Sequence, residues 1–339
     1  MTKVEKKRPT IFDVAKEANV SIATVSRVIN GIQNVSGDTK ELVLKAIDKL
    51  GFVSSNLARG LAKSQTLTVA VVIPSPNYNY ISSILSGMFD VCKIYGYLVN
   101  VFTFEDVDDA ARVVDQVISS RVEGIVIFNS QLNQNDLQKL TNISLPMVVI
   151  GNNALSNKNG LVCIDYSLEL KEVIYKKIIN QGIKEVVFLR DPDDNKDWHM
   201  VHNFDSAIEE GIKKSEQSVT YSHHYIKDSY MPIYEYYSEK FKQYPPHGEL
   251  YITPRDSVSI AISNAASDLG YRAGKDFEII GIIGTKTSKT ARPTISSFDV
   301  DLYEVGSITM RMLTKILDNS LKNKEFHFQT KYIARESAR

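Results

Sequence analysis

The amino-acid sequence predicts an α/β protein with a small all-α helix-turn-helix head followed by two doubly wound parallel-sheet lobes. Three observations lead to this fold class. Two short helical patterns flank a single break between Thr10 and Asn30. The first 64 residues carry a net charge of +5, and because the 339-residue chain is neutral, the remainder carries −5. From Leu67 onward, apolar runs alternate with helical segments, which is typical of parallel sheets covered on both faces.

The head begins with a capped helix and a tight turn. Thr10 followed by Asp13 is typical of a helix start, because the hydroxyl accepts from a free amide and the acid lies at the positive end of the helix dipole. Asn19 tolerates the left-handed backbone that a tight turn needs. Ser21 is a good cap for a second helix over Ile22–Ile29. Two helices joined by so short a turn indicate a helix-turn-helix.

Helical spacing sorts the second helix into two faces. The expected orientations are Val25, Val28 and Ile29 inward, and Ile22, Ala23, Ser26 and Arg27 outward. A third helix, from roughly Ser36 to Leu50, completes a small core. On spacing alone, the alternative is an ordinary three-helix bundle with no ligand. The charge favours phosphate binding, because eleven Lys or Arg residues stand against six Asp or Glu residues in the first 64 positions.

A short helical pattern, Asn56–Ala62, follows the head. An isolated helix of this length is unstable in water, so we expect it to form only when held against DNA and a partner. Leu61 would then be a wedge between base steps in the minor groove. The alternative is a flexible linker whose leucine packs on the neighbouring domain, and these residues alone do not separate the two.

The rest of the chain contains two rounds of buried runs and helices. The expected strands are TVAVVIP, YLVNVFTF, EGIVIF, PMVVIGN, LVCIDY, KEVVFLR, GELYIT and FEIIGI. The expected helices lie near residues 81–95, 113–118, 168–179, 201–213, 230–241 and 258–269. About 275 residues are more than one domain usually holds, so two lobes are expected.

The segments TIFDVAKEANVSIATVSRVINGIQNVSGDTKELVLKAIDKLGF and NLARGLA resemble the DNA-binding head and hinge helix of the LacI/GalR family of bacterial repressors. ARPTISSF and the spacing of the later strands extend the resemblance over the body. The resemblance implies a body of the periplasmic-binding-protein type, with three crossovers between lobes near Tyr166, Ser296 and Phe326. The expected boundaries are head 1–54, hinge 55–65, N-terminal lobe 66–166 plus 297–326, and C-terminal lobe 167–296 plus 327–339.

The resemblance also implies which residues touch DNA. Ile22 and Ala23 begin the recognition helix and contact base edges, and Arg27 is similar to the family's base-reading arginine. The positions of phosphate contacts are Thr10, Ser21, Thr24, Ser26 and Asn30. The positions that match the hinge helix are Asn56, Ala58 and Leu61, which favours the wedge. Two such heads, in a homodimer, would read a near-palindromic operator.

The cleft between the lobes departs from sugar-responsive relatives. Met200 stands where they carry an arginine, Ile283 where they carry an acid, and Arg255 where they carry Asn or Asp, although Asp256 is kept. Sugar recognition needs converging polar groups, so a conventional sugar effector is disfavoured. The candidate cleft residues are Tyr78, Trp198, Met200, Arg255, Asp256 and Ile283. A further alternative is a cleft that has lost ligand binding and serves only to dimerise the chain.

The segment YEVGSITMRMLTK is most similar to the catabolite-control branch of the family. In that branch the corepressor is the serine-phosphorylated form of the protein HPr. The matching residues are Tyr303, Glu304, Arg311 and Lys315, which recur at helical spacing and so share one face. An arginine–lysine pair can hold a phosphate. The alternative is a solvated helix face.

Other patterns exclude several function classes. No nucleophile elbow, P-loop or GxGxxG follows a strand, so we expect neither an enzyme nor a cofactor, and no histidine spacing predicts a metal site. Cys92 and Cys163 lie in apolar runs, which favours buried free thiols. A periplasmic sugar-binding protein would need an export signal, which is absent. The expected protein is a cytoplasmic, nucleoid-associated repressor, with additional activation left open.

Overall fold

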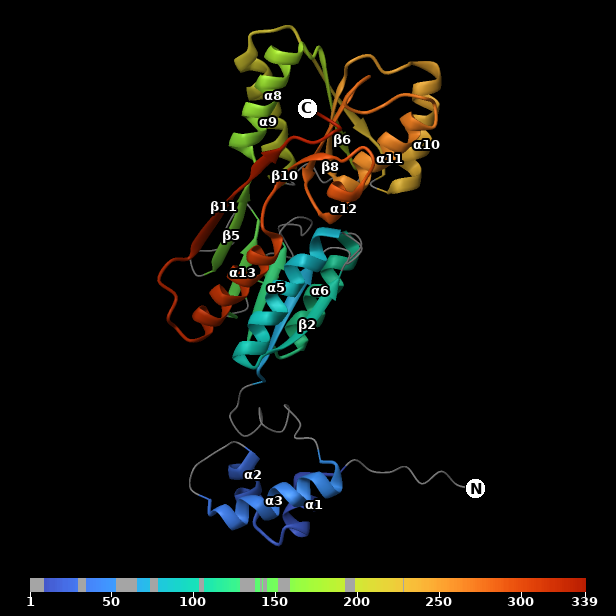
Figure 1. Ribbon diagram of the computed structural model, residues 1–339. Coiled ribbons are helices and arrows are strands. Elements are labelled where there is room, and N and C mark those ends of the chain that lie inside the picture. The colour runs from blue at the N-terminus through green and yellow to red at the C-terminus, as the bar shows by residue number, and fades with distance from the viewer. Residues whose placement is uncertain are drawn as a thin grey trace, which may run out of the picture. The chain divides into compact units, whose positions relative to one another are not determined.

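The computed structural model describes residues 9–29, 35–52, 66–73, 79–103, 107–128, 138–140, 142, 145–151, 159–192, 199–227 and 229–339, with the backbone alone at 107–111 and 199–202. The chain divides into two compact units, Met1–Leu67 and Thr68–Arg339 (Figure 1). Each unit has its own core, and we describe each by itself.

The small unit is a helix-turn-helix with a third helix, as predicted. Its helices are α1 (Ile11–Glu17), α2 (Ile22–Ile29) and α3 (Gly37–Leu50). Asn19, in the turn between α1 and α2, has a φ of 51°, the left-handed conformation expected of it. Val14, Val25 and Val43 contribute one side chain from each helix to a common core and are fully buried. This core fixes the orientation of α2, and so determines which of its side chains reach solvent.

The first sheet of the large unit is parallel, with described strands in the order β11-β5-β4-β3-β1-β2. Their bounds are β1 Thr68–Ile73, β2 Leu98–Thr103, β3 Gly124–Phe128, β4 Met147–Ile150, β5 Gly160–Asp165 and β11 Glu325–Gln329. Val69 and Val71 pack toward α5 (Asn79–Tyr95) and α13 (Leu302–Leu317), whereas Ala70 packs toward α6 (Val107–Ser119). Successive side chains of β1 therefore enter two separate cores, one on each face.

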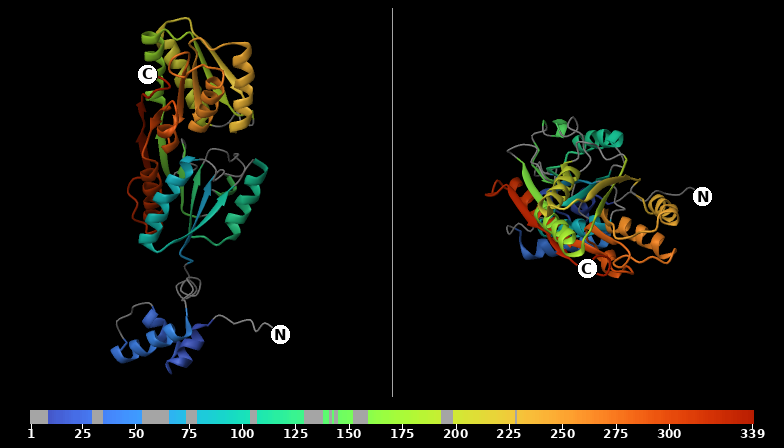
Figure 2. Two further views of the ribbon diagram at one scale, coloured as in Figure 1. Left: turned by 45° about the vertical axis from the view of Figure 1, so that its right-hand side comes forward. Right: turned by 90° about the horizontal axis from the view of Figure 1, so that it is seen from above.

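The second sheet has the order β12-β10-β9-β8-β6-β7 and is parallel except for β12, which runs antiparallel to β10. Its strands are β6 Glu185–Arg190, β7 Thr220–Tyr225, β8 Leu250–Arg255, β9 Glu278–Ile283, β10 Ser296–Asp299 and β12 Lys331–Ile333. Phe188 packs toward α8 (Ser167–Gln181) and α9 (His199–Ser215), and Val187 toward α10 (Tyr230–Gln243) and α11 (Asp256–Ser267). Both lobes are thus doubly wound, as the sequence predicted (Figure 2).

The chain passes between the two sheets three times. Strand membership places these passages after Asp165, Asp299 and Gln329. The sequence suggested Tyr166, Ser296 and Phe326, so the second and third passages come a few residues later along the chain. Thr330 Oγ1 donates to the backbone carbonyl of Asp165 over 3.1 Å, which ties two of the passages together. Adjacent crossings of this kind let one lobe move against the other without breaking either sheet.

Helices α5 and α13 pack closely on the same face of the first sheet, and both views show them side by side (Figures 1 and 2). Gly87 and Gly306 lie at their crossing. A Cβ atom added at Gly306 would lie 1.9 Å from the carbonyl oxygen of Ile84, and one at Gly87 would lie 2.0 Å from that of Tyr303. Only glycine allows the two backbones to approach this closely. The crossing fixes which side of α13 faces solvent.

Candidate functional sites

The first turn of α2 is held by the turn residues before it. Ser21 Oγ accepts from the backbone amide of Thr24 over 3.1 Å, and the hydroxyls of Ser21 and Thr24 lie 2.9 Å apart. The amide hydrogen bond satisfies a donor that a helix start would otherwise leave open. The cap predicted from the sequence is therefore present, and it engages two residues expected to contact phosphates.

Thr10 plays the same part at the start of α1. Its hydroxyl donates to Asp13 Oδ2 over 2.7 Å, and the Asp13 carboxylate also accepts from the backbone amide of Thr10. Both halves of a capping box are formed. Thr10 and Ser21 thus stand at two exposed helix starts. The Asp13 carboxylate occupies the positive end of the α1 dipole, whereas the first turn of α2 has no acidic residue and leaves that end open to a phosphate.

Helix α2 exposes three of the four residues that the sequence placed on its outer face. Ile22, Ala23 and Arg27 are exposed, while Ser26 is half-buried. On the inner side Val28 is buried, as is Val25. The helix contains no acidic side chain. An uncharged first turn followed by one arginine is a surface that can enter the major groove of DNA without repelling phosphates.

Four of the expected DNA-contacting residues lie outside the described residues. They are Asn30, Asn56, Ala58 and Leu61. The hinge helix and the minor-groove wedge therefore stay predictions from the sequence.

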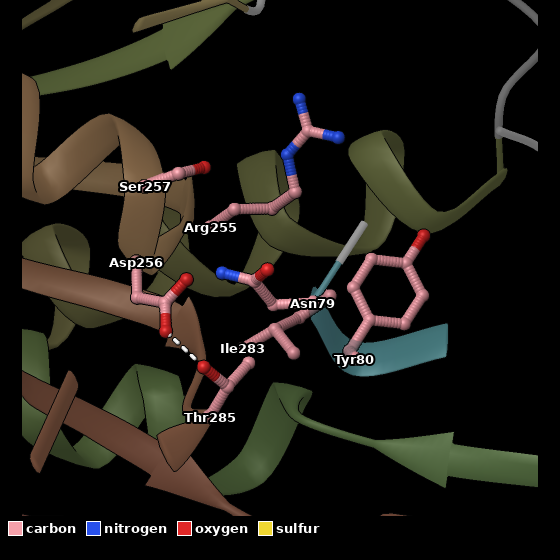
Figure 3. Close-up of a pocket in the computed structure, with 7 residues that line it drawn as sticks. All are labelled: Asn79, Tyr80, Arg255, Asp256, Ser257, Ile283 and Thr285. Carbon is pink, nitrogen blue, oxygen red and sulfur yellow. Dashed lines mark hydrogen bonds between the residues drawn. The ribbon is translucent and has the colours of Figure 1, made fainter. Parts of the chain in front are cut away.

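The large unit contains a cavity of about 120 Å³ at the carboxyl ends of the second sheet's strands (Figure 3). The lining residues are Asn79, Tyr80, Arg255, Asp256, Ser257, Ile283 and Thr285. The first two come from α5. Arg255 and Ile283 end β8 and β9, Asp256 and Ser257 begin α11, and Thr285 caps the short helix α12 (Lys286–Thr290). Both lobes contribute to the cavity, and the carboxyl edge of a doubly wound sheet is where such folds bind ligands.

A buried acid and a buried base stand at this cavity. Asp256 is 2% exposed and Arg255 is 9% exposed. Burial raises the pKa of the Asp256 carboxyl above its ordinary value, and the hydrogen bond that Thr285 donates to its Oδ2 acts in the opposite direction. The dashed line in Figure 3 marks that bond. The cavity therefore offers both a hydrogen-bond acceptor and a guanidinium to a small polar ligand.

One hydrogen bond beside the cavity joins the lobes. Asn79 Nδ2, at the first residue of α5, donates to Thr287 Oγ1 of α12 over 3.2 Å. Because the two residues belong to different lobes, a ligand that changed the separation of the lobes would stretch or break this contact.

Three of the six cleft candidates from the sequence line the cavity together: Arg255, Asp256 and Ile283. Met200 lies in α9, where the backbone alone is described, and Tyr78 and Trp198 lie outside the described residues. The sequence reasoning missed Asn79, Tyr80, Ser257 and Thr285. A usable signal existed for Asn79 and Tyr80, because they follow the buried run TVAVVIP closely and so lie near the carboxyl end of a strand.

The four residues singled out on α13 form one exposed face. Tyr303, Glu304, Arg311 and Lys315 are exposed, and the other residues of the helix are buried or half-buried. Tyr303 is 45% exposed, and its hydroxyl donates to Asp90 Oδ2 on α5 over 2.9 Å, which raises the pKa of the phenol. Arg311 and Lys315 lie one helical turn apart, so both can reach one phosphate. We call these four residues the α13 face.

Metal sites, membrane-spanning helices and reactive thiols are all absent from the described part of the chain. No cluster of His, Cys, Asp and Glu residues suited to a metal ion occurs there. None of its helices is long and apolar enough to span a membrane. Cys92 and Cys163 are free and buried, and burial raises the pKa of their thiols to about 12 and about 11. Neither thiol is a reactive nucleophile near neutral pH.

Comparison with protein families matches both units. Residues 10–55 match the model of the bacterial regulatory proteins of the lacI family. Residues 175–338 match the periplasmic binding protein-like domain. The first match corresponds to the helix-turn-helix unit, and the second to most of the second lobe together with α13 and β11 of the first.

Curated relatives match nearly the whole chain. Catabolite control protein A of Staphylococcus xylosus is 30% identical over 313 residues, covering 91% of this chain and 92% of the relative. The HTH-type transcriptional regulator pepR1 of Lactobacillus delbrueckii subsp. lactis is 28% identical over 345 residues, covering 98% and 99%.

Among solved structures, the Lac repressor dimer bound to operator and the anti-inducer ONPF has a TM-score of 0.83 at 19% identity, covering 98% of this chain and 99% of that one. At 19% identity, the match supports the fold alone. Taken with the curated relatives and the match of the head, it identifies the chain as a member of the LacI family, a non-enzymatic family of DNA-binding transcription regulators.

Proposed function

We propose that this regulator is a repressor in carbon catabolite control, and that serine-phosphorylated HPr docks on the α13 face as corepressor. The observation that carries the proposal is the exposure of Arg311 and Lys315 one turn apart, on a helix whose other residues, apart from Tyr303 and Glu304, are buried or half-buried. Two cations at this spacing suit a phosphoserine, which carries close to two negative charges. The similarity to catabolite control protein A over 91% of the chain supports the same assignment.

Besides its positive charges, the α13 face presents an aromatic ring and a hydrogen-bond acceptor. Tyr303 presents an aromatic ring whose hydroxyl is held by Asp90, and Glu304 supplies an acceptor at the same end of the helix. Aromatic and arginine side chains are enriched at protein interfaces. A partner that bears both a phosphate and a basic or apolar patch would therefore fit this face.

The proposal includes a cytoplasmic homodimer whose two heads bind a near-palindromic operator, with α2 in the major groove. The residues proposed to contact DNA are Thr10, Ser21, Ile22, Ala23, Thr24, Ser26, Arg27, Asn30, Asn56, Ala58 and Leu61. The proposed domain boundaries remain head 1–54 and hinge 55–65, followed by two lobes.

The test is the affinity of the full chain for its operator, measured by fluorescence anisotropy with phosphorylated or unphosphorylated HPr at micromolar concentration. We expect tighter DNA binding with the phosphorylated form alone. Replacing Arg311 and Lys315 by alanine should abolish this gain. Lys176→Ala, on an exposed site of α8 in the other lobe, should not change it. Equal DNA affinity with and without phosphorylated HPr contradicts the proposal.

The cavity favours a second candidate, a local operon repressor that responds to a small-molecule effector. Its buried Asp256 and Arg255 could each satisfy a polar group of the effector. Thermal unfolding with sugars and sugar phosphates tests this, because a ligand at about 100 times its dissociation constant adds about 2.7 kcal/mol of stability. A shift that Arg255→Ala removes and Lys176→Ala leaves intact supports an effector site. If no compound changes the unfolding temperature, the result favours a cleft that has lost ligand binding.

A further inference from the structure

The short helix α12 contacts both the cavity and the opposite lobe. Its N-cap residue, Thr285, donates to the Asp256 carboxylate at the start of α11. Two residues later, the hydroxyl of Thr287 accepts from Asn79 Nδ2 of the first lobe over 3.2 Å. A helix of five residues therefore connects the buried acid of the cavity to the start of α5.

Within its own lobe, α12 is held at several points. Besides the Thr285 hydroxyl, the backbone amides of Thr285 and Ser288 stabilise the Asp256 carboxylate, so all three lower its pKa against the effect of burial. Ser288 is fully buried, and its hydroxyl donates to the carbonyl of Thr285 over 2.7 Å. The carbonyl of Ser288 accepts from the amide of Ile295 over 2.8 Å. These bonds make α12 move with the second lobe.

The other end of the connection is equally well supported. Asn79 is the first residue of α5, a helix of 17 residues. Helix α5 packs on α13 at the close crossing of Gly87 and Gly306, so it moves with the first lobe. The bond between Asn79 and Thr287 thus joins two rigid bodies rather than two loops.

In two-lobed folds of this kind, a bound ligand usually supplies the contacts that hold the lobes together. Here the cavity is poor in free acceptors. Asp256 is the only acid among its described lining residues, and its carboxylate already accepts from the Thr285 hydroxyl. The apolar Ile283 also lines the cavity. The chain itself, through α12, supplies a contact across the cleft.

We propose that the hydrogen bond between Asn79 and Thr287 holds the two lobes closed without the help of a ligand, with α12 serving as an internal substitute for an effector. The inference goes beyond the corepressor proposal and needs only that the lobes can move about the three passages between them. One such bond is expected to favour the closed form about twofold to tenfold.

The test is the distance between the lobes in the full chain, measured by double electron–electron resonance. Spin labels are placed on Gln116→Cys of α6 and Glu235→Cys of α10, which are exposed positions in different lobes. Both helices lie away from β11 and the passages (Figures 1 and 2). Excess unlabelled chain ensures that only distances within one chain are measured. The native thiols Cys92 and Cys163 are buried and should not take up label.

Thr287→Val removes the accepting hydroxyl and keeps the branched shape of the side chain. We expect it to raise the ratio of longer to shorter distances about twofold to tenfold. Asn79→Ala removes the donor and should have the same effect. The double variant should open the lobes no further than either single variant, because both changes break the same bond.

Thr290→Val is the matched control. It makes the same substitution on the same helix, at an exposed residue whose hydroxyl bonds to the carbonyls of Lys286 and Thr287 within α12. Its distances should equal those of wild type. Because each lobe has its own cores, circular dichroism should show that all of these variants fold.

Three results would overturn the proposal. The distances could be unchanged in both Asn79→Ala and Thr287→Val, so that the bond does not hold the lobes. Thr290→Val could open the lobes as far as Thr287→Val, which would assign the effect to a weakened α12. The effects of the two single variants could multiply in the double variant, which would mean that the side chains act independently. The response of operator binding to phosphorylated HPr is a separate measurement, so the corepressor proposal stands or fails on its own.

Discussion

The hydroxyl of Tyr303 on α13 donates a 2.9 Å hydrogen bond to the carboxylate of Asp90 on α5, joining two residues that are 213 positions apart in the chain. The bond lies at the surface, directly above the close crossing at which Gly87 meets the backbone of Tyr303. The buried crossing therefore fixes the position of the α13 face, and the exposed bond fixes the orientation of its aromatic ring.

Tyr303→Phe removes this bond and keeps the ring. Since an exposed hydrogen bond contributes little, we expect the free energy of unfolding to change by less than about 1 kcal/mol. The gain in DNA affinity on adding phosphorylated HPr should nevertheless fall, because the ring is no longer held. Urea unfolding and operator binding, measured on the same preparations, check both parts. A normal response to phosphorylated HPr would show that the bond is irrelevant to docking.

Gly306→Ala tests the crossing itself. The new Cβ would lie 1.9 Å from the carbonyl oxygen of Ile84, so one helix has to move. We expect a loss of about 1–3 kcal/mol in the free energy of unfolding, the usual effect of overpacking. Gly37→Ala is the control, because open space surrounds that position and its φ is not in the left-handed region. Equal stability of the two variants in urea unfolding would show that the crossing accommodates a side chain and does not require glycine.

Arg27 provides the sharpest test of the recognition helix. Arg27→Ala should weaken specific operator binding by about 1–3 kcal/mol per half-site, while binding to random DNA is largely kept. Arg27→Lys keeps the charge and loses the planar fork, so it should also lose specificity while its salt dependence stays close to that of wild type. Competition titrations with cognate and random duplexes at several salt concentrations measure both quantities. An Arg27→Ala variant that still prefers the operator as strongly as wild type refutes the assigned role.

The sequence predicted the elements whose side chains are uniformly apolar or regularly spaced. β1 and β4 are continuous buried runs, and α2 shows its two faces in its spacing alone. Edge strand β7 was not among the predicted strands. Its Tyr221, His223 and His224 are half-buried, and both His223 and Tyr221 bond to Asp205 on a different element. Such partners lie outside any local sequence window.

β10 was missed for a related reason. Its serines are buried, and their hydroxyls need hydrogen-bond partners. The end of the chain supplies one: Ser296 Oγ donates to the carbonyl of Ala338 over 2.8 Å. The local sequence of Ser296–Asp299 is typical of a loop, because it contains no information about a hydrogen-bond partner about forty residues away. The cavity was half predicted in the same way. Arg255, Asp256 and Ile283 were found, whereas their neighbours Ser257 and Thr285 were not, nor were Asn79 and Tyr80, which come from the other lobe.

His224 makes the stability of the second lobe depend on pH. Burial lowers the pKa of its imidazole to about 4, with a smaller contribution from Lys240, and its Nδ1 lies 2.8 Å from the hydroxyl of Tyr237. A pKa lowered in the folded state means that the unfolded chain takes up the proton first as the pH falls. The contribution to stability is therefore complete well above pH 6.5 and is lost as the pH falls toward 4. The pKa difference corresponds to about 3 kcal/mol, which solvent screening of the half-buried ring reduces to roughly 2 kcal/mol.

The measurement is the free energy of unfolding in urea from pH 7.5 to 4.5, for wild type and His224→Gln. Glutamine can accept the Tyr237 hydrogen bond but does not titrate, so its curve should fall less steeply below pH 6.5. His247→Gln is the control of opposite sign. His247 is exposed, and the hydrogen bond to the Pro245 carbonyl raises its pKa, so its small contribution is present at low pH and lost as the pH rises. If His224→Gln and wild type lose stability in parallel below pH 6.5, the buried imidazole is not the group that couples folding to protons.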